Sequence, residues 1–291
     1  MKRTLLLLTL MTLTFSMGAK AQLEEPNEAG VTMGQVSLLV TDVDANLKFW
    51  TLLGGTPMKI DGVDVMKFPS LFIFLVPGKP VPQGARLTKE FCACPADGYE
   101  MSTLNHMGFN VRDFPKFRAD FTRIGAHMED LHNAKERTLL FSPDGVMLEI
   151  APSRNVMGKV GEMHFHTFVN DTPPINRDHQ VVGWESFLWY HRIFGTALMR
   201  VQQGSGVGDD LPGVKLRISE TRLPIVPTRG HAIDHIGFEV SHLEAFCKKL
   251  EADGIKFDEP YSTTRHKSFA SAMMTDPWGT SIELTEGLYK F

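Results

Sequence analysis

The sequence predicts an α+β fold in which four βαβββ-like modules form two domains. The main observation is an internal repeat, because residues 105–111 (NHMGFNV) parallel residues 234–240 (DHIGFEV). A second parallel joins the turns SPDG at 142–145 and DPWG at 276–279, and in both the final glycine lies four residues before a glutamate. Repetition at a fixed spacing indicates copies of one structural unit.

The fourth module begins with a strand and a helix. Residues 234–240 alternate apolar and polar side chains in the manner of a half-buried strand. Ser241 and Glu244 have the spacing of a capping box, which predicts the start of a helix. Gly254 stands where a left-handed glycine ends a helix. We therefore expect a strand, a helix and then a return to the sheet.

The same module closes with two further strands. We expect one strand at about 269–274, a turn at 276–279 from its Asp, Pro and Gly content, and a last strand at 280–284. Glu283 lies in the middle of that last strand.

The spacing between the first strand and the end of the helix supports four modules. The residue in the first strand and the glycine that ends the helix are 19 residues apart in three modules: Gln35 to Gly54, His106 to Gly125 and His235 to Gly254. In the third module His164 and Gly195 are 31 apart. The extra residues, at about 170–182, predict a loop that borders the pocket entrance.

Residues 1–21 have the features of an export signal. Two basic residues follow the first methionine, the apolar run at 5–17 is too short to span a bilayer, and AKA at 19–21 fits a cleavage site. We expect cleavage before Gln22, a periplasmic or secreted protein, and no membrane anchor once the signal is removed.

Composition narrows the classes of partner. Loss of residues 1–21 would lower the net charge from −4 to −7, and an acidic chain without a basic block argues against nucleic acid and anionic membranes. A small-molecule ligand is the expected partner. Three cysteines form no disulfide framework. Cys247 fits a packed helix face, while the redox state of Cys92 and Cys94 and the choice between monomer and homodimer stay open.

The motifs HIGFEV at 235–240 and DPWGTSIE at 276–283 resemble the vicinal oxygen chelate superfamily, which includes glyoxalase I, extradiol dioxygenases and bleomycin resistance proteins. The resemblance covers about residues 32–288. It implies that modules pair into open, curved mixed sheets, one in an N-terminal domain at 30–153 and one in a C-terminal domain at 160–288. It also implies metal ligands on the first and last strands of the modules.

Eight positions of this chain match those ligand positions. The first-strand positions are Gln35, His106, His164 and His235, and the last-strand positions are Phe74, Glu149, Arg217 and Glu283. With consecutive modules paired, the C-terminal set is His164, His235 and Glu283 with Arg217 in the fourth place, and the alternative N-terminal set is Gln35, His106 and Glu149.

The chemistry of the donors favours the C-terminal set. Two imidazoles and one carboxylate form the facial triad of non-haem Fe(II) enzymes, with open positions for a chelating substrate. Gln35 supplies only a weaker amide oxygen, although glyoxalase I enzymes use such a residue. We expect a divalent metal, with Fe(II) favoured over Mn, Ni or Zn, and a degenerate N-terminal domain.

Four further residues are candidates for the pocket. His166 lies two residues after His164 and so points to the same sheet face. By the resemblance, His266 takes the place of an extradiol dioxygenase histidine and is a candidate general acid or base. Met273 stands where that family has a tyrosine, and Tyr261 could replace it only if its loop folds back. Cleavage of a catechol ring therefore stays open.

These observations predict an exported metal-dependent enzyme whose small substrate chelates the metal through two oxygens, with dioxygenase-like chemistry favoured. The alternatives are an isomerase or lyase of the glyoxalase type and a non-catalytic binding protein of the resistance type. Three ligand-type residues at matched positions favour an enzyme, because a sequestering protein has no need of them.

Overall fold

A computed structural model describes residues 23–81, 85–87, 93–95, 101–131, 136–170, 184–199, 207–221 and 224–291. The expected export signal, Cys92 and nearly all of the expected loop at 170–182 lie outside these described residues, as does the side chain of Cys94. Within the described part of the chain, no helix has the length and apolar character needed to cross a membrane.

The fold is α+β, and each of its four modules consists of a strand, a helix and three more strands. The first contains β1 (Val31–Val40), α1 (Val43–Leu53), β2 (Thr56–Ile60), β3 (Val63–Phe68) and β4 (Leu71–Pro77). The second contains β8 (Leu104–Val111), α2 (Phe114–Arg123), β9 (Met128–Asp130), β10 (Thr138–Phe141) and β11 (Met147–Pro152). The third contains β12 (Val160–Val169), α3 (Trp184–Phe194), β13 (Ala197–Met199), β14 (Val207–Leu211) and β15 (Val214–Glu220). The fourth contains β17 (Ile233–Val240), α4 (Leu243–Ala252), β18 (Phe257–Ser262), β19 (Ala270–Thr275) and β20 (Ser281–Glu286).

Short elements connect and end the modules. They are β5 (Ala85–Leu87), β6 (Ala93–Pro95), β7 (Met101–Ser102), β16 (Ile225–Val226) and the terminal 3-10 helix η1 (Leu288–Lys290). β5 pairs with β6, and β7 pairs with β16.

The modules do not pair in the order expected from the sequence. Sheet 1 has the strand order β18-β19-β20-β17-β1-β4-β3-β2, so it combines the fourth module with the first. Sheet 2 has the order β13-β14-β15-β12-β8-β11-β10-β9 and combines the third with the second. Neither 30–153 nor 160–288 therefore forms a sheet of its own. The connection at 153–159 is short and keeps β12 beside β8, whereas 78–103 carries the chain from sheet 1 to sheet 2.

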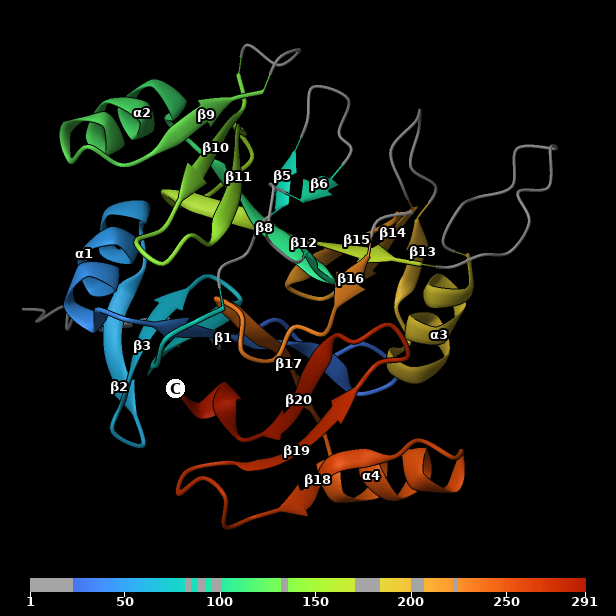
Figure 1. Cartoon of the computed structure of the whole chain (residues 1–291). Coiled ribbons are helices and arrows are strands. Elements are labelled where there is room, and N and C mark those ends of the chain that lie inside the picture. Colours follow the sequence, from blue (N-terminus) through green and yellow to red (C-terminus); the bar gives the residue numbers. More distant parts are fainter. Residues whose placement is uncertain are drawn as a thin grey trace, which may run out of the picture.

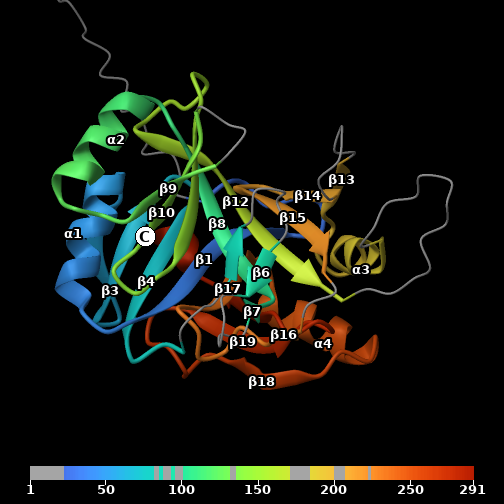
Figure 2. The same cartoon turned by 45° about the horizontal axis from the view of Figure 1, so that its top comes forward.

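Consecutive modules still pack against each other through their helices and the core. α1 contacts α2 at one end of the molecule, and α3 and α4 lie at the other (Figures 1 and 2). Phe68 and Phe109 join the first two modules with ring centroids 5.3 Å apart, and Phe194 and Phe238 join the last two at 4.8 Å. One continuous hydrophobic cluster includes residues of both sheets.

The two repeated turns also connect consecutive modules. Asp144, in the SPDG turn, accepts hydrogen bonds from the Thr41 backbone N–H at 3.0 Å and from Asn46 Nδ2 at 2.7 Å. Asp276, in the DPWG turn, accepts one from the Tyr190 hydroxyl at 2.7 Å. Each turn thus connects its own module to the module that precedes it in the sequence.

The capping box expected at the start of α4 does not form. His242 is the N-cap in a left-handed conformation, with φ of 58°, and has no side-chain capping bond. The carboxylate of Glu286 accepts from the backbone N–H groups of His242 and Leu243 at 3.1 and 3.2 Å instead. An acid from the end of β20 therefore satisfies the helix terminus, which a local sequence pattern does not indicate.

Candidate metal centre

The tightest cluster of possible metal ligands lies on sheet 2. His106, Glu149 and His164 each offer one ligand atom, and these atoms all lie within 4.8 Å of one another. Nε2 of His106 and Nε2 of His164 are each 3.5 Å from Glu149 Oε2. Among the described residues, this is the one group of at least three histidine, cysteine or acidic side chains that meets this distance.

Strand register brings the three side chains together. Gly108, on β8, is paired with Glu149 on β11 on one side and with His164 on β12 on the other. A Cβ atom at Gly108 would lie 2.0 Å from Cε1 and 2.5 Å from Nε2 of His164. The missing side chain therefore creates the space that the His164 ring occupies.

His106 is oriented for coordination. Its Nδ1 is 2.8 Å from Asn105 Oδ1, and a hydrogen bond there places the proton on Nδ1 and leaves the lone pair on Nε2. Nε2 is buried and has no hydrogen-bond partner among the described residues. A buried acceptor without a partner is costly, so this atom fits a missing ligand such as a metal ion.

The electrostatics suit a cation. Burial, together with the nearby His164, lowers the pKa of His106 in spite of the carboxylate beside it, so the imidazole is neutral. Burial opposes ionisation of Glu149, but its interactions with His106 and His164 outweigh burial and lower the pKa of the carboxyl group far below its usual range. A neutral imidazole at His106 and an ionised carboxylate at Glu149 are the protonation states that metal binding requires of these two residues.

Three more side chains surround the cluster. Arg137 Nη1 is 2.8 Å from Glu149 Oε1 and holds that carboxylate from the side of β10. The ring of His166 packs against His106 with centroids 4.8 Å apart, and its Nε2 is 2.8 Å from Ser219 Oγ. Burial lowers the pKa of His166 well below its usual value. His166 is thus a neutral wall of the site, and Arg217 lies beside it on β15.

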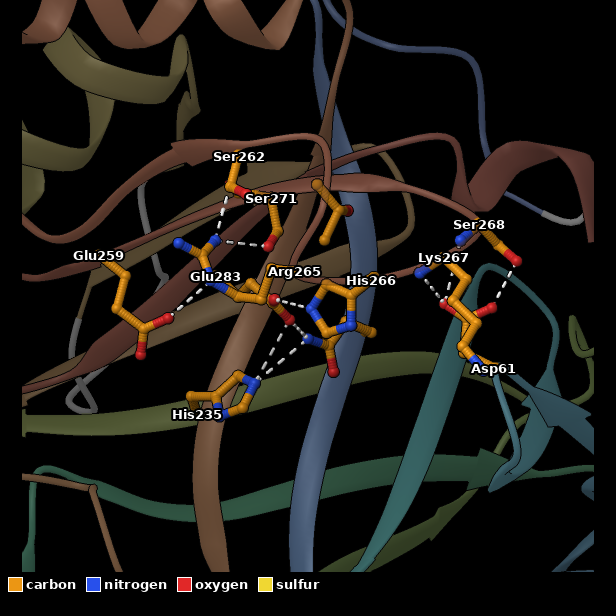
Figure 3. Close-up of polar contacts among 12 residues, drawn as sticks. Asp61, His235, Glu259, Ser262, Arg265, His266, Lys267, Ser268, Ser271 and Glu283 are labelled. Atoms are coloured by element: carbon orange, nitrogen blue, oxygen red, sulfur yellow. Dashed lines mark hydrogen bonds and ion pairs between the residues drawn. The ribbon is translucent and has the colours of Figure 1, made fainter.

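Sheet 1 carries a related cluster at the matching positions. Gln35 on β1, His235 on β17 and Glu283 on β20 meet there, and His266 joins them from the loop before β19 (Figure 3). Gln35 Nε2 donates to Glu283 Oε2 at 2.5 Å, and His235 Nε2 is 3.5 Å from the same oxygen. A Cβ at Gly237 would lie 2.7 Å from Cγ of Gln35, so a strand glycine again makes the space.

The loop that carries His266 is held at both sides (Figure 3). Asp61, in the turn between β2 and β3, accepts hydrogen bonds from the backbone N–H groups of Lys267 and Ser268 at 2.8 and 3.0 Å. Arg265 donates to the Ser271 carbonyl oxygen at 2.8 Å. His266 Nε2 is then 3.0 Å from Glu283 Oε1.

The sheet 1 cluster fits a metal less well, because its ionisable groups Glu283 and His235 already have partners, although Gln35 Oε1 is buried without a partner among the described residues. Both oxygens of Glu283 have partners within the protein. Burial disfavours a charge on His235, but hydrogen bonds with Asp234 and Glu283 prevail and raise its pKa to about 9. A metal would have to displace that proton. The last-strand position of the first module, which could supply a fourth ligand, is also apolar, since it is Phe74 and packs against Phe269.

The structure corrects the expected ligand set. His164 belongs to sheet 2, whereas His235 and Glu283 belong to sheet 1, so these three side chains do not form one site. The alternative set is divided in the same way, because Gln35 is in sheet 1 while His106 and Glu149 are in sheet 2. The candidate ligands do lie on the first and last strands of their modules, as expected. The ligand sets differ because consecutive modules do not share a sheet.

Of the other two expected pocket residues, Tyr261 lies away from both clusters, whereas Met273 lies beside Glu283 of the sheet 1 cluster. Tyr261 is near Glu244, Cys247 and Glu286, which belong to α4 and its N-terminal cap, so it lies on the helix-covered side of the sheet. Met273 is buried in β19 opposite Glu283 and offers no hydroxyl.

Sequence reasoning missed three residues that build the sheet 2 site. Asn105 and Gly108 flank His106 within the repeated motif, and the parallel Asp234 and Gly237 around His235 were a signal that could have identified them. Arg137 had no such signal, because it reaches Glu149 from a neighbouring strand.

The comparisons with known proteins agree with this architecture. Glyoxalase I from Zea mays superposes with a TM-score of 0.64 at 12% sequence identity, covering 89% of this chain and 94% of that one. A proposed dioxygenase from Bacillus subtilis superposes with a TM-score of 0.60 at 11% identity, covering 92% and 86%. At such identities the likeness concerns the fold alone. No curated protein matches the sequence.

Fold and site together define a class of α+β proteins with four paired βαβββ modules and a His–Glu–His cluster on a sheet. Residues 185–284 match the model of the Glyoxalase/Bleomycin resistance protein/Dioxygenase superfamily. For residues 185–284 the match confirms the resemblance that the sequence motifs indicated.

Proposed function

We propose that this protein is a metal-dependent enzyme that acts on a small substrate chelating the metal through two oxygens, at a site formed by His106, Glu149 and His164. The observation that supports it is the cluster itself, in which two imidazole nitrogens lie 3.5 Å from one carboxylate oxygen. Two histidines and a carboxylate are the donor set of non-haem Fe(II) oxygenases. We therefore favour Fe(II) and dioxygenase-like chemistry.

A bound divalent ion would supply Lewis acidity and a template for two substrate oxygens. The protein would contribute a prearranged set of donors. Asn105 holds the His106 ring, Arg137 holds Glu149, and His164 is partly exposed, with 21% of its side chain accessible. Substrate would therefore approach from the side of His164, while buried His106 forms the floor of the site.

Metal analysis of paired variants tests the location. We expect the anaerobically purified protein to contain nearly stoichiometric metal, His106→Ala to lose most of it, and the matched variant His235→Ala to retain it. Two remaining ligands hold a divalent ion poorly, whereas His235 lies in the other sheet. Loss of metal from His235→Ala with retention in His106→Ala would place the centre on sheet 1.

The identity of the metal separates the reaction classes. Iron, with oxygen consumption in the presence of a catechol, supports the dioxygenase. Manganese, nickel or zinc without oxygen consumption supports an isomerase or lyase of the glyoxalase type. A wild-type protein that takes up none of these metals would refute the proposed enzyme and leave the binding protein.

We also propose that the protein is exported and cleaved before Gln22. The support is the basic start, short apolar run and small-residue site of residues 1–21. N-terminal sequencing of protein from the periplasm or medium should begin at Gln22, and material that begins at Met1 would contradict the proposal.

A further inference from the structure

Beside the proposed metal centre lies a guanidinium that forms no salt bridge with any described residue. Arg217 on β15 is paired with His166 on β12, and paired residues of neighbouring strands share a face of the sheet. The His166 ring packs against His106, so this face is the one that carries the cluster. Arg217 and the cluster residues His106 and His164 all act electrostatically on the same His166 ring.

Among the described residues, those paired directly with Arg217 carry no negative charge. His166 lies on one side, and on the other side β14 places Gly208, which has no side chain, opposite Arg217. Arg217 forms no salt bridge with a described residue, and its Nη1 is buried without a hydrogen-bond partner. An arginine side chain offers only hydrogen-bond donors, and the described residues leave this one free to bind an anion.

Each of the other two cations near the site has an acid beside it in the sheet. Arg137 is paired with Glu149 at 2.8 Å. Lys215, two residues before Arg217 on the same strand, lies opposite Asp210 on β14. Arg217 differs from them because the residues directly opposite it on β12 and β14 are not acids. Its position is not that of a ligand, because a guanidinium has no lone pair for a metal.

We propose that Arg217 binds a carboxylate of the substrate, so that the enzyme acts on acids whose two chelating oxygens are accompanied by a separate carboxylate. Hydroxylated aromatic acids are one such class. The proposal rests on the function proposed above, because it places the chelating end of the substrate at His106, Glu149 and His164. A guanidinium and a carboxylate form paired, charge-assisted hydrogen bonds, and such contacts confer specificity as well as affinity.

Binding of matched acids and amides tests the proposal. The probes are 2,3- and 3,4-dihydroxybenzoate and their neutral amides, measured anaerobically by calorimetry on the metal-loaded protein. Loss of a hydrogen bond to a charged group costs about 1.5–3 kcal/mol, so the wild-type protein should bind at least one acid roughly 10- to 100-fold more tightly than its amide. Arg217→Met should reduce this ratio to about 1 while its metal content stays at the wild-type value.

Two further variants keep the result interpretable. Arg217→Lys preserves the charge but not the paired donors, and should restore the preference only in part. Lys215→Met removes a cation from the same face of the same strand and should leave the preference unchanged. Equal affinity of the wild-type protein for acid and amide, or an equal loss of preference in Lys215→Met, would overturn the role of Arg217 while leaving the metal enzyme intact. A wild-type protein that binds metal but none of the four probes would overturn the proposed substrate class, and one that binds no metal would refute both proposals.

Discussion

Alanine at Gly108 should disrupt the metal centre without altering any ligand. Its Cβ would lie 2.0 Å from Cε1, 2.5 Å from Nε2 and 2.6 Å from Nδ1 of the His164 ring. Real Cβ atoms do not approach other heavy atoms so closely. The ring sits at the partly exposed side of the site, so it has room to swing away.

The magnitudes separate two effects. Overpacking costs about 1–3 kcal/mol, and the replacement of a strand glycine by alanine returns about 0.5–1 kcal/mol. The metal-free variant should therefore be about 0–2.5 kcal/mol less stable than the metal-free wild-type protein. Metal affinity should fall at least about 10- to 100-fold, because even the loss of a group that merely orients a ligand has that effect.

Metal affinity measured by chelator competition, together with urea unfolding of the metal-free protein, is the assay. Gly161→Ala is the matched control in the same sheet, because its Cβ would lie in ordinary contact, 3.5 Å from Cγ1 of Val156. It should retain full metal affinity. In a His164→Ala background, Gly108→Ala should have no further effect on metal affinity, since the ring it displaces is absent.

Wild-type metal affinity in Gly108→Ala would refute the reasoning, because the His164 ring would then be no ligand or would not occupy the described position. A further loss of affinity on adding Gly108→Ala to His164→Ala would show that the substitution acts through the backbone of β8 instead.

Two other predictions follow from the same structure. Asn105→Ala should lower the metal affinity of the sheet 2 site by about 10- to 100-fold in the same competition assay, because it frees Nδ1 of His106, whereas Asp234→Ala should leave that affinity unchanged. Burial raises the pKa of Asp209 to about 7 in the folded protein, so the folded state prefers the neutral acid, and this contribution to stability is complete below the unfolded pKa and declines as pH rises through about 7. Asp209→Asn should therefore raise the free energy of unfolding more at pH 8 than at pH 5, and an equal change at both values would contradict the assigned protonation state.

Local patterns in the sequence were enough to determine the modules. Alternation of apolar residues, helix-ending glycines and the two repeated turns describe interactions between residues close in the chain. They correctly placed strand β17, the buried face of α4 and the left-handed Gly254. They also placed histidines on first strands and glutamates on last strands, as β8, β12, β17, β11 and β20 confirm.

Side chains that arrive from distant segments left no such pattern. Arg137 reaches Glu149, Asp61 holds the loop of His266, and Glu286 caps α4 in place of the expected capping box. The local sequence around each of these residues does not identify its partner, which is defined only by the folded chain.

The pairing of modules was decided by the tertiary structure alone. β1 and β8 both offer an edge with the same alternation, so β8 could meet β1 or β12 without changing any local pattern. In the structure β8 pairs with β12 and β1 pairs with β17. That choice places His106, His164 and Glu149 in one site and separates His164 from His235. It depends on connection lengths and on a core shared by all four modules, which are properties of the whole chain and not of any segment.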